Sequence, residues 1–593
     1  MSISEGLTGY ERRLHELQEN LEQARSRVAA SVAGAAVAIA LFATSAFYAF
    51  QHQIPWWVPP LLLLPAVFAA RGCSRYRRTE AGLSRLERFY RRALERVQGN
   101  WIGNRVSGEE FDDGGHAYAR DLHIFGEGSL FELLATTRTA IGQRGLANYL
   151  LAASSRDEAR LRQEAVRELQ PRQELREQIA LLGEFEFEEA KWEPFASFLE
   201  SPILPFPTAL RIASLLTSAA LVGLLIAGIV GLAWPTAASW AVPLISFHAM
   251  AGLAFRDRVN RMAESVRTVS GETQVLREGL RLMQMQQFQS AKLRSLTEKV
   301  RNGSGSIRTL ERLLVSLRER NKEWFYLPSL LLLLGTQLCM GIENWRSQNR
   351  DALRGWMDAW GEFEALNALA GYAYENPEYV FAELCDEVCF EARDLGHPLL
   401  PQDHCVRNDV HWNLQSRFYI ISGSNMAGKS TLLRTIGLSA VLSYAGAPVR
   451  AQQARLSHFS VCASLAVVDS LLTGKSKFAA EVDRLRQMIV TGQEGGGVLF
   501  LIDEIFSGTN SRDRRIAAEA VVRTLLDHGA VGAMSTHDLA LTEIAGDGML
   551  LGVNVHMGSR EGGEPMDFDY LLKPGVTQES NALAIARMAG VPV

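Results

Sequence analysis

One short segment constrains this chain more than any other feature: Gly423, Ser424, Asn425, Met426, Ala427, Gly428, Lys429, Ser430 and Thr431 follow one another between an apolar run and a helix-like stretch. This is the pattern of a phosphate-binding loop. Glycines let backbone N–H groups turn inward around phosphates, Lys429 brings positive charge to the β- and γ-phosphates, and Ser430 offers a hydroxyl to Mg²⁺. A strand before the loop and a helix after it separate the pattern from a chance glycine-rich turn. The sequence therefore predicts a nucleoside triphosphate site.

A pair of carboxylates follows a second apolar run, Val498 to Ile502, which has the composition of a buried strand. Asp503 and Glu504 end this run, 74 residues after Lys429. An aspartate at the end of a strand beside the loop can hold Mg²⁺, and the next carboxylate can act as a general base on the attacking water. Most Asp-Glu pairs are solvated surface charge, but few lie directly behind five apolar residues. We therefore expect hydrolysis as well as binding.

Together these motifs resemble the ATPase domain of the MutS family of DNA mismatch repair proteins. The likeness also rests on Gly508-Thr509, Asp513, Ser535-Thr536-His537, Asn554-Val555-His556, Ala584, Ala586, Gly590 and Pro592. Residues 474–481 are similar to the family's Ser-x-Phe-x-x-Glu signature, with Ser476, Phe478 and Glu481 in its places. Residues 128–142 and 162–166 are similar to the start of the family's core helical domain. The likeness covers most of residues 115–200 and 260–593.

The resemblance implies roles for single residues. Lys429 would contact phosphate, Ser430 and Asp503 would hold Mg²⁺, and the catalytic set would be Glu504, His537 and Asn425, the last two at the γ-phosphate. Ser476 would act in trans, because two ATPase domains of this family pack head to tail. ATP, Mg²⁺, a homodimer and DNA are thus implied. Read alone, His537 also fits a satisfied core histidine, but its place after a strand and beside a threonine favours the phosphate.

The chain departs from the family's pattern at two places. Phe506-Ser507 stand where the repair proteins usually carry Gly-Arg, and Arg512 and Arg514 stand where they carry Tyr and Gly, so we expect different dimer contacts. No mismatch-reading domain with its Phe-x-Glu wedge precedes the core region. Residues 185–188 spell that triplet only by chance, within an acidic stretch. Mismatch recognition is therefore not expected.

Apolar stretches of membrane length stand before and within the core region. Ala29 to Phe50 holds about 22 residues without a charge, enough to cross a hydrocarbon core near 30 Å. Ile54 to Ala70 starts with Trp56-Trp57 and is followed by Arg71, Arg75, Arg77 and Arg78. Ile212 to Trp234 and Ala237 to Phe255 form a second pair, followed by Arg256, Arg258 and Arg261. We predict four transmembrane helices in two hairpins; buried core helices of a large soluble protein are the alternative.

Four spans keep both termini on one side of a bilayer, and the arginines next to the spans place that side in the cytoplasm. The expected location is the cell (inner) membrane, multi-pass, with the ATPase domain cytoplasmic. A signal peptide is not expected, because about 28 polar, charge-rich residues precede the first apolar run. Leu327 to Ile342 is a fifth apolar run, which we assign to the core because a fifth span would put the ATP site outside the cell.

The expected fold class is an α/β P-loop ATPase domain with a doubly wound sheet of the ABC/MutS type, an all-α core and lever domain, and the membrane helices. Strands are expected at 418–422, 460–468, 498–502 and 531–534, with helices from Lys429, Lys477, Arg512 and His537 and a late hairpin at 549–557 and 566–572. The expected segments are an N-terminal cytoplasmic helix (1–28), hairpin 1 (29–71), a linker helix (72–114), the beginning of the core helical region (115–205), hairpin 2 (206–255), lever and core helices (256–375) and the ATPase domain (376–593).

Composition adds little drive toward nucleic acid, since the net charge is −5. Ser84 to Gln98 and Asn260 to Asn321 have helical patterns, the second broken at 302–306. Arginines of the second stretch could meet DNA phosphates: Arg277, Arg281, Arg294, Arg301, Arg308, Arg312, Arg318 and Arg320. Interleaved glutamates (Glu272, Glu278, Glu298, Glu311 and Glu319) favour a salt-bridged helix face instead. The six cysteines lack zinc-site spacing and fit a reducing compartment.

Three functions fit these patterns. The favoured one is a membrane-anchored MutS-like ATPase whose nucleotide cycle opens and closes a dimer, with DNA as the family's ligand. An ABC-type transporter half is the second, although the signature lacks Leu-Ser-Gly-Gly-Gln and a large helical domain intervenes. The third is an ATP-driven mechanical or scaffold protein that acts on a membrane or protein partner without DNA.

Overall fold

A computed structural model describes residues 3–152, 154–183, 201–202, 206–229, 234–319, 329, 332–424, 426–465, 477–495, 497–506, 510–546, 550–560 and 567–577. The chain divides into two compact units. The first unit comprises Met1–Thr136, Ala147–Leu181 and Leu366–Val593, and the second comprises Thr137–Leu146 and Leu182–Ala365. The division into seven segments given above stays a prediction.

A six-stranded sheet forms the centre of the first unit, with strand order β10-β9-β4-β8-β7-β6. Its strands are β4 (Phe418–Ser422), β6 (Ser460–Ser464), β7 (Val498–Asp503), β8 (Val531–Thr536), β9 (Gly552–His556) and β10 (Lys573–Pro574). All neighbours are parallel except β10, which pairs antiparallel with β9. The four strands expected from the sequence are confirmed, although β6 ends earlier and β7 and β8 continue into the polar residues of the site.

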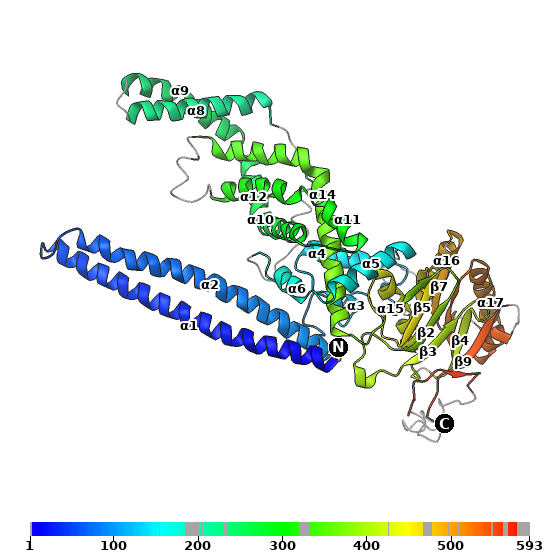
Figure 1. Cartoon of the computed structure of the whole chain (residues 1–593). Helices are drawn as coiled ribbons and strands as arrows, with labels where there is room; N and C mark the ends of the chain where they lie inside the picture. The colour runs from blue at the N-terminus through cyan, green and yellow to red at the C-terminus, as the bar shows by residue number, and fades with distance from the viewer. Residues whose placement is uncertain are drawn as a thin grey trace, which may run out of the picture. The chain divides into compact units, whose positions relative to one another are not determined.

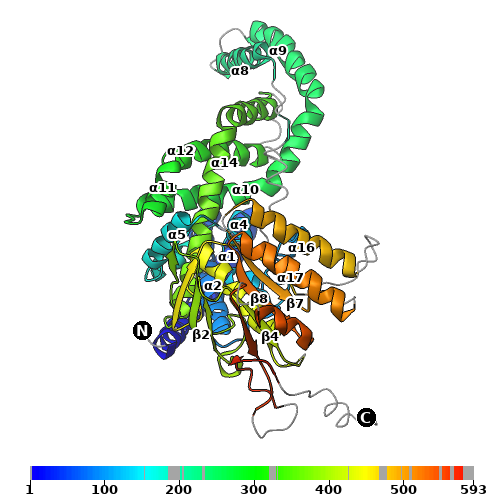
Figure 2. The same ribbon diagram turned by 90° about the vertical axis from the view of Figure 1, so that its right-hand side faces the viewer.

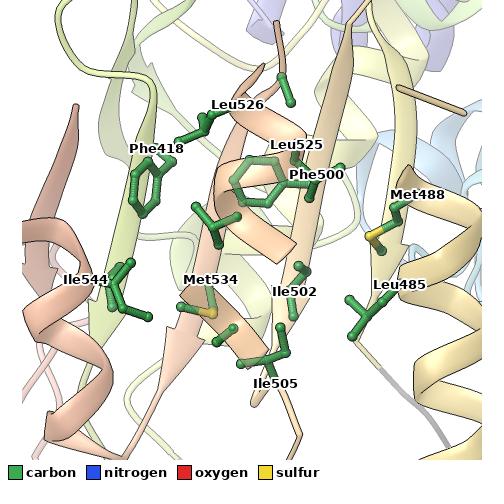
Figure 3. Packing of buried hydrophobic residues seen from close by; sticks show 14 of the residues in the cluster. Phe418, Leu485, Met488, Phe500, Ile502, Ile505, Leu525, Leu526, Met534 and Ile544 are labelled. Atoms are coloured by element: carbon green, nitrogen blue, oxygen red, sulfur yellow. The ribbon is translucent and has the colours of Figure 1, made fainter. Parts of the chain in front are cut away.

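Helices cover both faces of this sheet, as expected. Alternate residues of a strand point to opposite faces. Phe500 and Ile502 of β7 join a buried cluster with side chains of α16 (Lys477–Gln493), α17 (Ser511–Asp527) and η4 (Leu539–Gly546) (Figure 3). α16 and α17 lie side by side on that face (Figure 2). Leu501 instead lies against Gly437 of α15 (Lys429–Ala445), where an added Cβ would come within 2.8 Å of Leu501.

A smaller four-stranded sheet was not expected from the sequence. Its order is β1-β5-β2-β3, from β1 (Glu383–Cys385), β5 (Gln453–Ser457), β2 (Phe390–Leu395) and β3 (Asn408–Trp412). The late hairpin is confirmed in kind: β9 and β10 are antiparallel, and Ser559 and Phe568 form a further antiparallel bridge. Its second strand, however, begins at Lys573, beyond the expected stretch.

The first unit also contains short helices: η1 (Glu109–Phe111), α3 (Leu130–Leu134), α5 (Arg156–Leu169), α6 (Gln173–Ala180) and η3 (Gln402–His404). The residues of α4 (Ala140–Leu151) are divided between the two units. The buried residue Asp121 connects the segment before α3 to the sheet domain by hydrogen bonds. Its carboxylate accepts hydrogen bonds from the Leu465 N–H (2.8 Å) and from Arg484 (2.5 Å), and its carbonyl accepts one from Arg434 (3.0 Å). The expected core region and the sheet domain thus share a buried polar junction.

Two long helices form the N-terminal portion of the first unit. α1 (Ile3–Phe50) and α2 (Val58–Val97) run alongside each other (Figure 1). The first half of α1 and the second half of α2 share a buried cluster that includes Tyr10, Leu17 and Tyr90. The helix expected from Ser84 to Gln98 is the second half of α2, so one continuous helix joins it to the preceding apolar run.

The second unit consists of helices: α8 (Thr208–Ile229), α9 (Trp234–Ala254), α10 (Arg256–Met285), α11 (Ala291–Lys299), α12 (Gly303–Glu319) and most of α14 (Leu334–Glu375). The long helical stretch from residue 260 is therefore broken twice. Some of its arginines form salt bridges with the interleaved glutamates, as expected for a salt-bridged helix face: Arg277 pairs with Glu311 (2.5 Å) and Arg301 with Glu298 (3.1 Å). The described portion of the fifth apolar run forms the buried first turns of α14.

The prediction of four spans is wrong in number. In the described ranges, two helical segments are long and apolar enough to cross a membrane, Gly9–Phe50 in α1 and Ala209–Gly228 in α8. The run Ile54 to Ala70 is not one of these segments. Its first residues lie in a turn and α2 begins at Val58, so only about 13 helical residues precede Arg71, whereas a membrane span needs about 20. In α9 only a shorter apolar helix, Ser239–Ala254, is found.

Candidate nucleotide-binding site

The glycines of the loop after β4 have conformations that other residues rarely adopt. Gly423 has a φ of 145°, and an added Cβ would lie 2.2 Å from the carbonyl oxygen of Met557. Gly428 has a φ of 96° and caps α15, where an added Cβ would lie 3.0 Å from the Tyr570 ring. Positive φ is strained for residues with a side chain. The glycine positions are therefore required by the path of the loop from strand to helix.

Lys429, the first residue of α15, folds back into this loop. Its side chain is buried, and Nζ donates hydrogen bonds to the carbonyl oxygens of Gly423 (2.6 Å) and Ser424 (2.8 Å). Burial lowers the pKa of Lys429, while Asp503 and Glu504 act in the opposite direction. The buried Ser424 Oγ has no hydrogen-bond partner among the described residues. The interior of the loop thus holds a cation and an unused hydroxyl, as a phosphate site requires.

The end of β7 meets the start of α15 through the Asp503 carboxylate. Ser430 Oγ donates to Asp503 Oδ2 at 2.5 Å, and Ser535 of β8 donates to Asp503 Oδ1. Ser535 lies opposite Asp503 because β7 and β8 are parallel in that register. A carboxylate beside hydroxyl groups offers the hard oxygen donors that Mg²⁺ prefers. Asp503 and Ser430, paired in our expectation, do lie in contact. The contact of Ser535 was missed, because it depends on the register between β7 and β8.

Glu504 stands one residue beyond this carboxylate in an uncommon backbone conformation, with a φ of 54°. Its backbone N–H donates to the carbonyl oxygen of Ser535 at 3.1 Å. Its side-chain Oε1 lies 3.1 Å from Nδ1 of His537, whose side chain is 53% exposed. His537 is thus no core histidine. The site thus gathers at the carboxyl ends of three parallel strands: the phosphate loop follows β4, Asp503 and Glu504 lie at the end of β7, and His537 follows β8. Asn425 and Ser476 lie outside the described residues.

A buried glutamate on α16 holds the turn that follows Glu504. The Glu481 carboxylate accepts a hydrogen bond from the backbone N–H of Phe506, which has a φ of 53°. The rings of Phe478 and Phe506 lie 6.0 Å apart. Arg514 donates to the Phe506 carbonyl at 3.1 Å and to Asp538 at 3.3 Å. Two residues at which the chain departs from the MutS pattern therefore contact each other, and the signature glutamate acts within its own chain.

A cavity of 390 Å³ adjoins the loop on the side of β2 and β3. Apolar side chains in its wall include Leu395, Val406, Met557 and Tyr570, and polar ones include Asn408, Lys429 and Ser430. His397, also on its wall, is buried, and burial together with nearby Arg434 and Arg450 lowers its pKa to about 4. A cavity of this size that combines apolar and polar side chains suits a small ligand.

Comparison with known proteins agrees with this geometry. Residues 419–593, which contain the loop, Asp503, Glu504 and His537, match the family model for MutS domain V. The C-terminal portion of the chain, residues 419–593, thus carries the likeness to the MutS family. The chain is 32% identical over 240 residues to the DNA mismatch repair protein MutS of Methanosarcina barkeri, which is 39% of this chain and 26% of that protein. It is 29% identical over 281 residues to MutS of Thermus aquaticus, or 47% of this chain and 33% of that protein.

The likeness to MutS proteins is confined to a portion of each chain. A third relative, MutS of Thermotoga petrophila, is 28% identical over 235 residues, or 29% of its own length. The chain thus spans about a quarter to a third of the length of the curated relatives that it matches. The match to the family model begins at residue 419, inside β4. The long helices α1, α2 and α8 lie before that match.

Proposed function

We propose that the C-terminal domain binds and hydrolyses ATP. The observation that carries this proposal is the contact between Ser430 and Asp503, which joins the phosphate loop to the strand end that bears Glu504. In this proposal the nucleotide-binding residues are those from Gly423 to Thr431. Lys429 turns from the loop carbonyls to the β- and γ-phosphates, which supply stronger acceptors for its charge.

The proposed division of labour follows from the positions of the polar groups. Ser430 and Asp503 would hold Mg²⁺, which neutralises phosphate charge when bound. Glu504 accepts the proton of the attacking water, and His537 holds the Glu504 carboxylate through the 3.1 Å contact. Asn425 and His537 face the γ-phosphate, as the family resemblance implies. The cavity beside the loop takes the base and sugar, because Lys429 and Ser430 lie in its wall.

The assembly and the ligand of the proposed enzyme come from the family. We propose a homodimer in which Ser476 of one subunit completes the site of the other. We also propose that hydrolysis is coupled to DNA, because the relatives are named DNA mismatch repair proteins. The net charge of −5 gives DNA no general attraction, so a DNA contact would have to be local.

We further propose that the chain is membrane-associated through the apolar stretches of α1 and α8, with the nucleotide site on the cytoplasmic side of the membrane, where ATP is present. The apolar windows of both helices are only 11% buried inside the protein, which is low for core helices. Two such helices in the described part of the chain are fewer than the helix bundle of a transporter half needs, which disfavours the ABC-type alternative.

A mechanical role remains a second candidate because α2 is anchored next to the sheet domain. Arg96, at the end of α2, pairs with Glu375, at the end of α14, and both side chains are buried. A nucleotide-driven movement of the sheet domain could therefore pass to the α1–α2 hairpin. In this case ATP hydrolysis would respond to a membrane or protein partner and not to DNA.

Steady-state ATPase activity of the detergent-solubilised chain separates these candidates. It is measured with and without duplex, mismatched and branched DNA at a stated, moderate salt concentration, and the Glu504→Ala variant gives the background rate. Stimulation by DNA that fades at higher salt supports a DNA-coupled ATPase. Hydrolysis that no DNA changes moves the proposal to the mechanical role. No hydrolysis above the background under any condition overturns the ATPase assignment.

A further inference from the structure

Arginines gather at one level of the α1–α2 hairpin. We call Arg71, Arg75, Arg77 and Arg78 of α2, with Arg25 and Arg27 of α1, the arginine collar. All six side chains are exposed. Arg25 pairs with Glu80 at 3.5 Å, but no ion pair involves the four α2 arginines within the described ranges. The collar is thus a band of positive charge that the fold leaves largely uncompensated.

The antiparallel pairing of the helices fixes the height of this band. Gly72 of α2 lies level with Ser31 of α1, since a Cβ added at Gly72 would be 3.8 Å from Ser31 Oγ. Further down, Arg25 meets Glu80. The α1 arginines therefore stand beside the α2 arginines. From Arg71 to Arg78 the helix rises about 10 Å, enough to extend through the headgroup layer, which is about 5–8 Å deep on each side of a bilayer.

The hairpin beyond the collar is uncharged and mostly exposed. Residues 28–70 contain no Asp, Glu, Lys or Arg. Large apolar side chains face outward along both helices, among them Val37, Ile39, Phe47, Leu64 and Phe68. From Ser31 to Phe50 α1 rises about 29 Å, close to one hydrocarbon thickness. Trp56 and Trp57 at the turn are exposed, as aromatic side chains in contact with a membrane would be.

From these observations we propose that the arginine collar binds the phosphate groups of anionic phospholipids in the leaflet that the hairpin enters first. The inference rests on the membrane association proposed above and names the lipid class that it selects. Guanidinium groups bind phosphate in a bidentate manner, and basic residues next to an inserted apolar segment attract anionic lipid.

A second copy of the chain fits this surface less well. Two hairpins packed side by side in one membrane would bring their collars to the same level, so that like charges would face each other. Lipid phosphates instead lie at that level all around the hairpin and have the opposite charge. The apolar length and the charge of the collar are thus both matched by an anionic bilayer.

The test uses the full chain in liposomes of phosphatidylcholine and phosphatidylglycerol. Spin-labelled forms of the two lipids report which one is immobilised at the protein surface. We expect phosphatidylglycerol to be preferred about fivefold at low salt, with the preference shrinking at high salt. The variant R71Q/R75Q/R77Q/R78Q is expected to immobilise lipid but to lose most of the preference. A control of equal charge change, R12Q/R91Q/R486Q/R560Q, removes exposed arginines outside the collar and is expected to keep it.

Each other outcome has a distinct meaning. An unchanged preference in the collar variant overturns the inference while leaving membrane association intact. Immobilisation of neither lipid by the unmodified chain contradicts the proposed membrane association itself. Immobilised lipid without any preference, together with disulfide cross-linking between copies that carry Gly34→Cys, shows that a second copy covers the hairpin and also overturns the inference. Gly34 suits this probe because its surroundings are open.

Discussion

Replacing Glu481 by alanine should slow ATP hydrolysis without weakening ATP binding. Glu481 lies on α16, outside the phosphate loop in sequence, and its carboxylate accepts a hydrogen bond from the backbone N–H of Phe506, two residues after the proposed base. Glu504 and Phe506 both have positive φ, at 54° and 53°. The turn is therefore held by its contacts and not by the preference of its residues.

The size of the effect follows from the bond that is lost. A hydrogen bond to a charged group contributes about 1.5–3 kcal/mol, and its loss leaves the Phe506 N–H unsatisfied. If this energy holds the turn in its active form, that form becomes about 10- to 150-fold less populated. We expect kcat to fall by roughly that factor in Glu481→Ala, while the Kd for a fluorescent ATP analogue changes less than about twofold, because the loop is untouched.

The conservative variant Glu481→Gln provides the control. Its amide oxygen can still accept the Phe506 N–H, so most of kcat should return. Rates are measured by phosphate release and affinities by fluorescence titration on the same preparations. A Glu481→Ala variant with the unmodified kcat, or a Glu481→Gln variant as slow as Glu481→Ala, would refute the positioning role.

Further predictions concern the loop, the hairpin anchor and pH. Gly423→Ala should abolish ATP-analogue binding and lower the unfolding free energy by about 1–3 kcal/mol, because its Cβ would lie 2.2 Å from the Met557 carbonyl oxygen; titration and thermal unfolding measure both effects. Arg96→Met should cost about 3–5 kcal/mol by leaving Glu375 buried and unpaired, and Arg96→Met with Glu375→Leu should recover most of it, as followed by urea unfolding. Folding lowers the pKa of His397 to about 4, so as the pH falls this histidine is protonated in the unfolded chain before it is protonated in the folded chain. Stability of the sheet domain should fall by about 3 kcal/mol in total as pH drops from 6.5 to 4, and His397→Gln should flatten this dependence in pH-resolved melting curves.

Local pattern predicted the sheet domain well. The runs at 418–421 and 498–502 are apolar along their whole length, as is typical of strands buried on both faces, and both lie in strands. α15 begins at Lys429, where the loop pattern requires a helix. The contact between Ser430 and Asp503 also follows from local motifs, because ends of parallel strands share one edge of the sheet.

Features that depend on long-range packing could not be predicted in this way. The contact of Ser535 with Asp503 requires the β7–β8 register, and that of Glu481 with Phe506 requires the placement of α16 against the sheet. The small sheet joins β1 and β2 to β5, whose paired residues lie about 60 to 70 residues later, and no local signal links these segments. The count of four spans failed because hydropathy does not locate the turn before Val58, which shortens the second apolar helix.

The most direct test of the central claim compares Glu504→Ala and Lys429→Ala in ATP binding and hydrolysis. Our account predicts that Glu504→Ala binds ATP with nearly unchanged affinity while hydrolysis falls by about 10²- to 10⁴-fold, since only the general base is removed. Lys429→Ala should instead lose most of its ATP affinity. Hydrolysis at the normal rate by Glu504→Ala would contradict the assignment of the base and of the site built around it.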